Sequence, residues 1–302
     1  MAAVKHRKDG VVQQSRDGLA KWIGSMQNVT LIEGHARFTG PRAIEVGDRA
    51  LQAERIFLNV GGRASVPDIP GLKDVPFLNN NGIMEIDRVP EHLVIIGGSH
   101  IGLEFAQMYR RFGAMVTVIE LAPKLLPRED DDVAAEIRAI LEREGVEILL
   151  GVKNLNVQKT GDRVRIDNSQ KPVEGSHVLL AVGRLPNTQD LGLKEAGIAA
   201  DARGFITVDD QCRTSAEGVW TLGDCNGRGA FTHTSWNDYE IVAANLFDKD
   251  PRKISDRIPC STSCTRRSPT RRAPARCTSI PRSRSWCRRC SSLSGRSAEP
   301  AG

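Results

Sequence analysis

The clearest pattern of hydrophobic and polar positions lies between residues 93 and 150. Runs typical of buried strands occupy residues 93–96, 115–119 and 146–150, and they alternate with helical patterns at 101–112 and 131–144. The second helical pattern begins with acidic residues, where the helix dipole favours them. A β-α-β-α-β order over about 60 residues is typical of a parallel, doubly wound sheet. Residues 155–158 and 163–167 predict an antiparallel excursion, and residues 178–182 predict a return to the parallel sheet.

Shorter patterns flank this central unit. Residues 11–26 place several apolar side chains on one helical face, and we expect short strands at 29–33, 35–39 and 43–46. A stronger strand at 55–60 leads directly into Gly61 and Gly62. Further along the chain, we expect strands at 205–208 and 219–222 and a helix at 235–246.

Length and composition are those of a globular protein with a core. The chain has 302 residues, 40% of them hydrophobic, which is enough for two domains of ordinary size. No apolar run reaches the roughly 18 residues that a membrane span needs. The charged first ten residues lack the apolar stretch of a secretory signal. We therefore expect a cytoplasmic protein with no membrane partner.

The charge is distributed unevenly along the chain. Residues 260–302 contain ten Arg, ten Ser and five of the seven Cys, with Glu299 as their one acidic residue, so this segment carries +9. Because the whole chain carries +5, the remainder carries −4. Residues 260–302 also show no sustained apolar period, and we predict that this tail is disordered.

A glycine-rich turn follows the first strand of the central unit. Residues 93–104 read L-V-I-I-G-G-S-H-I-G-L-E, which places Gly97, Ser99 and Gly102 at the three positions of a G-x-G-x-x-G fingerprint. The first position makes the turn, the second must be small where backbone approaches a pyrophosphate, and the third lets helix and strand pack closely. The pyrophosphate would lie on free N–H groups at the helix N-terminus.

An acidic residue strengthens this interpretation. Glu120 ends the second strand, 23 residues after Gly97, where a carboxylate can accept both ribose hydroxyls of an adenosine. The same carboxylate would repel the 2′-phosphate of NADP unless a cation such as Lys124 compensates, so we favour NADH. The alternative is a plain glycine turn beside a surface acid.

Three further segments carry a resemblance to a known family. Residues 55–67, R-I-F-L-N-V-G-G-R-A-S-V-P, and 182–187, V-G-R-L-P-N, resemble the two crossovers of class I pyridine nucleotide-disulfide oxidoreductases. Residues 220–224, W-T-L-G-D, are similar to the late flavin motif of that family. Residues 97–106 and 227–234 look most like mercuric reductase and dihydrolipoamide dehydrogenase relatives.

The resemblance implies an α/β fold in which a Rossmann-like NAD(P)-binding domain, residues 89–186, is inserted in a partial FAD-binding domain made of residues 1–88 and 187–259. The disordered tail would then span residues 260–302. Its implied cofactors are FAD and NAD(P)H, and its members form homodimers. FAD would be held by Gly61, Arg184, Gly223 and Asp224. The nicotinamide dinucleotide would be held by Gly97, Gly98, Ser99, His100, Ile101, Gly102, Glu104, Glu120 and Gly183.

Some family features are not found in this sequence. We identify neither the first FAD-binding strand-turn-helix nor the C-x4-C redox pair, since the first cysteine is Cys212. The dimerisation domain with its His-Glu pair is also missing. We therefore assign no catalytic residue and no metal ligand.

Several other residues have a plain alternative to a functional role. Glu104 matches a family carboxylate near the nicotinamide but can equally be a solvated helix acid, and His233 is interpreted as a local structural histidine. Cys212 and Cys225 are isolated and suit buried positions. The pairs Cys260-x3-Cys264 and Cys287-x-x-Cys290 arise by chance in a segment without a fold pattern.

Three hypotheses about function remain. The first is a flavin- and NAD(P)H-dependent oxidoreductase whose disulfide or metal-ion reduction is lost in this chain. The second is a non-catalytic fragment that binds NAD(H). The third, a nonspecific nucleic-acid binder through the Arg-rich tail, lacks an aromatic platform beyond Trp286, so we assign no specific nucleic-acid partner.

The change in composition after Pro259 predicts a shifted reading frame in a GC-rich gene, because such frames translate into Arg, Ser, Pro and Cys. Translation of the other two frames of the gene beyond this point is expected to yield a dimerisation-domain sequence. Finding no such sequence in either frame would overturn the hypothesis.

Overall fold

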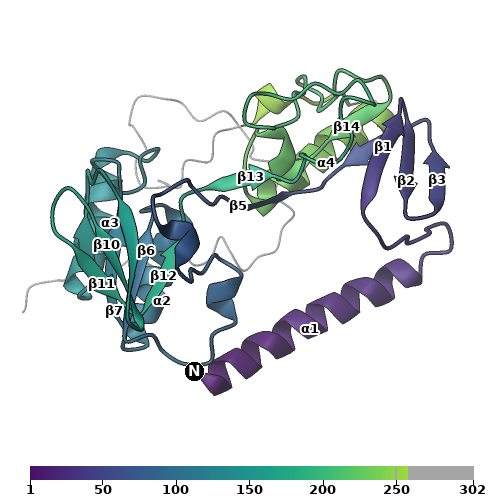
Figure 1. Cartoon of the computed structure of the whole chain (residues 1–302). Coiled ribbons are helices and arrows are strands. Elements are labelled where there is room, and N and C mark those ends of the chain that lie inside the picture. Colours follow the sequence, from purple (N-terminus) through teal and green to yellow (C-terminus); the bar gives the residue numbers. More distant parts are fainter. Residues whose placement is uncertain (249, 258–302) are drawn as a thin grey trace, which may run out of the picture. The chain divides into compact units, whose positions relative to one another are not determined.

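The computed structural model describes residues 1–248 and 250–257 (Figure 1). The chain divides into two units, Met1–Ser263 and Cys264–Gly302, and all described residues belong to the first. The predicted disordered tail, with its five cysteines and Trp286, lies outside the described residues. No helix in the described part of the chain combines the length and apolar character needed to cross a membrane.

The central unit is built on a parallel sheet with the strand order β12-β6-β7-β8. The strands are β6 (His92–Ile96), β7 (Met115–Ile119), β8 (Glu147–Leu149) and β12 (His177–Leu180). Helix α2 (His100–Arg111) joins β6 to β7, and α3 (Asp131–Arg143) joins β7 to β8. Each predicted strand and helix of this unit is present within two residues of its expected ends. The predicted parallel β-α-β-α-β order is confirmed.

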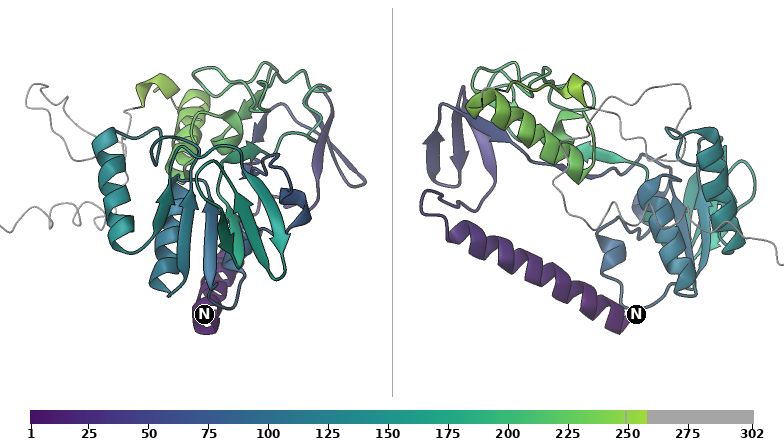
Figure 2. Two further views of the ribbon diagram at one scale, coloured as in Figure 1. Left: turned by 60° about the vertical axis from the view of Figure 1, so that its left-hand side comes forward. Right: turned by 180° about the vertical axis from the view of Figure 1, so that it is seen from behind.

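Strand β6 shows how the sheet is covered on its two faces. Leu93 and Ile95 pack in one core cluster with buried residues of α2 and α3. Val94 and Ile96 point the other way, because side chains alternate along a strand, and they pack against β9 (Asn156–Thr160), β10 (Arg163–Asp167) and β11 (Val173–Gly175). These three strands form an antiparallel sheet, seen beside the parallel strands in Figure 2. A small sheet thus takes the place of the second helical layer that a doubly wound fold would have.

The flanking segments form smaller sheets. Strands β1 (Ala36–Gly40), β2 (Ala43–Val46) and β3 (Arg49–Gln52) make an antiparallel meander, and β4 (Ile56–Leu58) pairs in parallel with β14 (Val219–Thr221). Strand β5 (Gly62–Ala64) pairs with β13 (Arg184–Pro186) where the chain enters and leaves the central unit. Helix α4 (Thr232–Phe247) packs beside β14 through Ile241 and Val242.

The first helix is longer and more exposed than its sequence pattern suggests. Helix α1 spans Ala2–Gly24, whereas the apolar pattern predicted residues 11–26, and it contains no buried residue. Its apolar stripe is open, with Leu19 at 54% and Trp22 at 60% exposure. Short 3-10 helices occur at η1 (Leu72–Asp74), η2 (Gly82–Met84), η3 (Gly223–Asn226) and η4 (Ile254–Asp256).

Two predicted strands are wrong. Residues 29–33 form no strand, and residues 205–208 contribute only an isolated bridge between Ile206 and Ala200. Their residue types favour extended backbone, but a strand also needs a partner edge, and residues 29–33 find none. Strands β3, β5, β11 and β13 are three or four residues long, too short for a recognisable alternation.

Candidate functional site

The glycine turn lies at the end of β6 and depends on close backbone contacts. Gly97 has a φ of 114°, and a Cβ atom added to it would lie 2.4 Å from the carbonyl oxygen of Ala181. A Cβ on Gly102 would lie 2.2 Å from the carbonyl oxygen of Gly97. Neither position has room for a side chain, and Gly97 also has a φ that L side chains rarely adopt. The turn thus draws together the end of β6, the residues after β12 and the first turn of α2.

The start of α2 leaves a hydroxyl and several backbone N–H groups available. Ser99 is the N-cap residue, and its side chain makes no capping hydrogen bond. His100 follows, with its Nε2 atom 3.8 Å from the Glu129 carboxylate. Ile101 and Glu104 lie in the first turns of α2, and Glu104 is exposed. Partial positive charge at a helix N-terminus favours an anion, so this end of α2 suits a phosphate group.

The Glu120 carboxylate is fixed next to this turn. Its Oε2 atom accepts a hydrogen bond from the Gly98 N–H at 2.6 Å, and its Oε1 atom accepts one from the Ala122 N–H at 2.8 Å. The residue follows β7, as predicted. These two bonds orient a carboxylate at the carboxyl edge of the parallel sheet, where ligands of open α/β sheets bind.

The cation considered as a counter-charge for Glu120 is engaged elsewhere. Lys124 Nζ lies 2.6 Å from an Asp131 carboxylate oxygen and 2.8 Å from the Glu129 carbonyl oxygen. The pKa of Asp131 is lowered by the hydrogen bond from Lys124. Lys124 therefore neutralises the start of α3 rather than Glu120.

Arg184 connects residues of the second predicted set, the FAD-binding residues Gly61, Arg184, Gly223 and Asp224. Its Nη2 group donates to the Gly62 carbonyl, and its Nε atom lies 3.3 Å from Asp224 Oδ2. The second contact is an ion pair without hydrogen-bond geometry, since Arg184 Nε is buried without a hydrogen-bond partner among the described residues. Gly223 begins η3 with a φ of 72°. The backbone around Gly61 is tied to the same crossover.

Asn187 supplies that tie. Its N–H donates to the Gly61 carbonyl at 3.1 Å, and its side-chain amide donates to the Val60 carbonyl at 3.0 Å. Residues more than a hundred positions apart in the sequence are therefore held at one place. Gly183, predicted with the nucleotide set, has a φ of 128° and precedes β13, where its carbonyl accepts the Ser65 N–H at 3.0 Å. It lies at the crossover rather than in the glycine turn.

Sequence reasoning missed two residues at the second set. A Cβ on Gly223 would lie 2.8 Å from the side-chain oxygen of Asn59, so Asn59 closes one side of this turn. Asp238 on α4 is fully buried and accepts the Gly223 N–H at 2.7 Å. A carboxylate on the same helical face as Ile241 and Val242 was the available signal for Asp238.

The two cysteines of the described residues are unsuited to thiolate chemistry. Cys212 and Cys225 are both buried and unpaired, as predicted. Burial, together with the nearby Asp238 charge, raises the pKa of the Cys212 thiol to about 12. Burial also raises the pKa of Cys225. The described residues contain no cluster of acidic, His and Cys side chains that could hold a metal ion.

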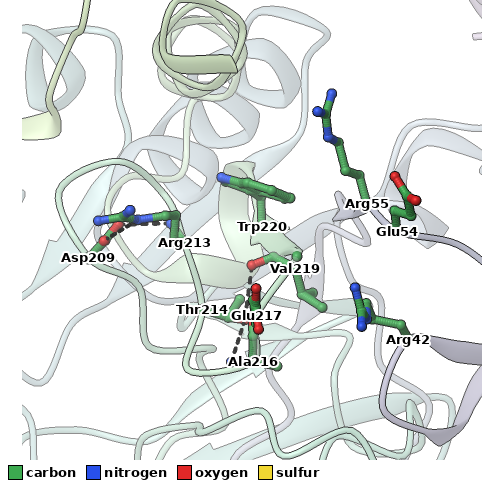
Figure 3. Close-up of a pocket in the computed structure, with 11 residues that line it drawn as sticks. Arg42, Glu54, Arg55, Asp209, Arg213, Thr214, Ala216, Glu217, Val219 and Trp220 are labelled. Carbon is green, nitrogen blue, oxygen red and sulfur yellow. Dashed lines mark hydrogen bonds and ion pairs between the residues drawn. The ribbon is translucent and has the colours of Figure 1, made fainter.

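Two hollows lie near β4 and β14. One, of about 520 Å³, is mostly apolar and reaches the second set through Asn59 and Ser235. The other, of about 600 Å³, surrounds Trp220 and is lined by side chains of both charges. Figure 3 shows that the side chains of Arg42, Arg55 and Arg213 extend in different directions around it. This second hollow contains none of the predicted site residues and presents no converging charge.

Comparisons with known proteins give a consistent relationship. A family model described as pyridine nucleotide-disulphide oxidoreductase matches residues 1–238. The probable pyridine nucleotide-disulfide oxidoreductase RclA of Escherichia coli is 36% identical over 256 residues, covering 83% of this chain and 58% of RclA. A dihydrolipoyl dehydrogenase of Thermus scotoductus is 35% identical, covering 80% of this chain and 54% of its own length. A mercuric reductase of Bacillus cereus is 28% identical, covering 83% of this chain and 40% of the mercuric reductase.

The structure agrees with these sequence comparisons. The solved structure of the HOCl-induced flavoprotein disulfide reductase RclA from Escherichia coli aligns with a TM-score of 0.81 at 35% identity. The alignment covers 85% of this chain and 59% of that one. The chain therefore spans about half the length of the curated relatives that it matches.

Substitution at Gly102 tests the close backbone contact. Gly102→Ala is expected to lower the free energy of unfolding by about 2 kcal/mol or more, because the new methyl group overlaps the Gly97 carbonyl. The matched control is Gly18→Ala inside α1, where nothing lies within 4 Å of the added methyl group. This change is expected to stabilise the helix by up to about 1 kcal/mol. Urea denaturation measures both, and equal effects at the two sites would contradict the prediction.

Proposed function

Because this chain belongs to the pyridine nucleotide-disulphide oxidoreductase family, we propose that it is the part of a flavin-dependent reductase that binds NADH and holds the ribityl side of FAD. The observation that carries the proposal is the joint presence of two sites in one chain. The glycine turn at Gly97 has an adjacent oriented carboxylate, and Arg184 joins both crossovers to Asp224.

The nucleotide site fits the diphosphate and ribose of a dinucleotide. The missing side chains at Gly97 and Gly102 let the turn, the residue after β12 and the start of α2 pack closely, and α2 directs its N-terminal N–H groups to this corner. Glu120 would accept the ribose hydroxyls, since each of its oxygens keeps a free lone pair beyond the backbone hydrogen bond. Ser99 would donate its uncapped hydroxyl to a phosphate oxygen. His100 and Ile101 would line the same end of the helix, and Glu104 would face the nicotinamide half.

The flavin site fits the carbohydrate-like chain of FAD. Asp224 is only a quarter exposed and lies 3.3 Å from Arg184 Nε, and its carboxylate oxygens can accept hydrogen bonds from hydroxyl groups. The turns at Gly61 and Gly223 would border the same part of the cofactor, with the Gly223 N–H held by Asp238. When bound, NADH supplies the hydride and the flavin accepts it, so the part of this chain is to bind and orient both cofactors.

The chain by itself is proposed not to reduce a disulfide or a metal ion. Family reductases pass electrons from flavin to a cysteine pair, whereas Cys212 and Cys225 are buried with raised pKa values. A non-catalytic NAD(H)-binding fragment is the second candidate. It is favoured by the nucleotide site, whose glycine turn and oriented carboxylate both lie within residues 97–122.

The absorbance spectrum of the purified chain separates the two candidates. Flavin-binding is expected to give a yellow protein with a stoichiometric visible flavin band that NADH bleaches under anaerobic conditions. A colourless protein that NADH still stabilises against heat would support the fragment alone. Steady NADH-dependent turnover of a disulfide or of mercuric ion would contradict the absence of reductase activity.

Glu120 is expected to set the preference for NADH over NADPH. Glu120→Gln removes the negative charge and should weaken NADH binding by roughly tenfold or more, because a hydrogen bond to a charged group contributes about 1.5–3 kcal/mol. The same change should leave NADPH binding unchanged or improved, since repulsion of the 2′-phosphate is relieved. Fluorescence titration with each nucleotide measures both affinities.

The matched control is Glu136→Gln, an exposed acid on α3 that pairs with Arg143. It should not alter either affinity. Parallel losses of NADH and NADPH affinity in Glu120→Gln would argue that the residue supports the turn and does not select the nucleotide.

A further inference from the structure

One buried carboxylate lies behind the turn that carries Asp224. Asp238 has 0% exposure and is the only charged residue among the fully buried polar residues of the described chain. A buried charge is costly unless it is paired and hydrogen-bonded on all sides. We therefore expect hydrogen bonds and a positive charge around Asp238 that offset the free-energy cost of its burial.

The Oδ2 atom of Asp238 contacts both ends of η3. It accepts the Gly223 N–H at 2.7 Å and the side-chain amide of Asn226 at 2.9 Å. Asn226 also donates to the Thr221 carbonyl at 3.1 Å, which connects η3 to the end of β14. The residues that begin and end this four-residue turn are therefore bound by one carboxylate oxygen, with Asp224 between them.

The Oδ1 atom of Asp238 is paired with a positively charged side chain from the last described residues. Arg257 donates to it through Nη2 and also donates through Nε to the Asn237 side chain at 2.7 Å. The Arg257 side chain is only 20% exposed, and its Nη1 atom is buried without a partner among the described residues. The weakly solvated guanidinium therefore has few alternatives to Asp238. The Cys212 thiol completes the surroundings of Oδ1 at 3.7 Å.

Arg257 itself is positioned by a separate set of contacts. It directly follows η4, whose Ile254 N–H donates to the Asp210 carbonyl at 2.8 Å. The Ser255 N–H donates to an Asp210 carboxylate oxygen at 3.0 Å. The guanidinium is thus delivered to Asp238 by a short fixed segment rather than by a free chain end.

We infer that Asp238 is a positioning residue for the flavin-binding turn, and that Arg257 supplies the charge that makes its burial possible. The inference rests on the proposed function, because the role of the turn is to present Asp224 to FAD. The partly exposed Asp224 carboxylate would bind the cofactor, while the buried Asp238 carboxylate would fix both ends of the turn that carries Asp224.

Hydrogen exchange of the full chain without cofactor tests the arrangement directly. Asp238→Asn and Arg257→Gln are each expected to raise exchange in residues 219–227 by about tenfold or more, because each removes one partner of a buried pair. Exchange in residues 92–111, which contain β6 and the start of α2, should stay unchanged. Arg257→Lys keeps the positive charge and should restore part of the protection. The control Asp248→Asn changes an exposed carboxylate at the end of the same helix and should have no effect.

Cofactor titration supplies the second readout. FAD affinity should fall by about tenfold or more in Asp238→Asn and Arg257→Gln, whereas NADH affinity should stay within about twofold. If Asp238→Asn does not fold, Arg257→Gln carries both measurements. Unchanged exchange in residues 219–227 would overturn the inference, and so would faster exchange with undiminished FAD affinity.

The two proposals fail in different ways. If the unmodified chain binds no FAD but the variants show faster exchange at residues 219–227, the flavin function is wrong, while the Asp238–Arg257 anchoring of the turn is retained. If the unmodified chain binds FAD and the variants match it in both measurements, the flavin function stands and the positioning role is wrong.

Discussion

The close contact of three backbone segments at Gly97 is the constraint on which the central unit depends. β6 ends there, the residue after β12 approaches within 2.4 Å of where a Cβ would be, and α2 begins. The absence of two side chains allows helix, turn and sheet to share one corner. Glu120 reaches the same corner because β7 runs parallel to β6 and ends beside it. A different residue at either glycine would separate the helix from the sheet edge where its N-terminus is useful.

The second group of residues is assembled on another principle. Its residues come from distant parts of the sequence, next to the short strands β4, β13 and β14. Charged side chains join these segments. Arg184 connects the Gly62 carbonyl to Asp224, and Asp238 connects the turn that carries Asp224 to α4. Sterics determine the first site, whereas electrostatic pairing in a poorly solvated environment determines the second. The second site should therefore be the more sensitive of the two to changes of charge.

The strands, helices and glycine turn of the central unit could be predicted because their sequence patterns are local. The strands at 93–96 and 115–119 have long buried runs, and the glycine spacing after the first defines a turn whose geometry is locally encoded. Pairing between distant short segments was out of reach, because β5 and β13 have three residues each and their partnership joins Gly62 to Pro186. The strand expected at 29–33 is absent because these residues favour extended backbone but have no neighbouring strand to pair with. Asp238 was overlooked because its place on the apolar face of α4 indicates burial, but not that Gly223, Asn226 and Arg257 are its partners.

The pairing of β5 with β13 has a consequence for how such a chain can change over time. The central unit leaves the surrounding fold on one strand and returns on its antiparallel neighbour, so the two junctions are adjacent in space. The two ends of the segment between β5 and β13 therefore stay one strand spacing apart, whatever the length of that segment. Because the entropy of closing a loop grows slowly with its length, insertions or deletions within the unit would cost the host little. Duplication, replacement or enlargement of the segment between β5 and β13 would therefore leave this strand pairing in place.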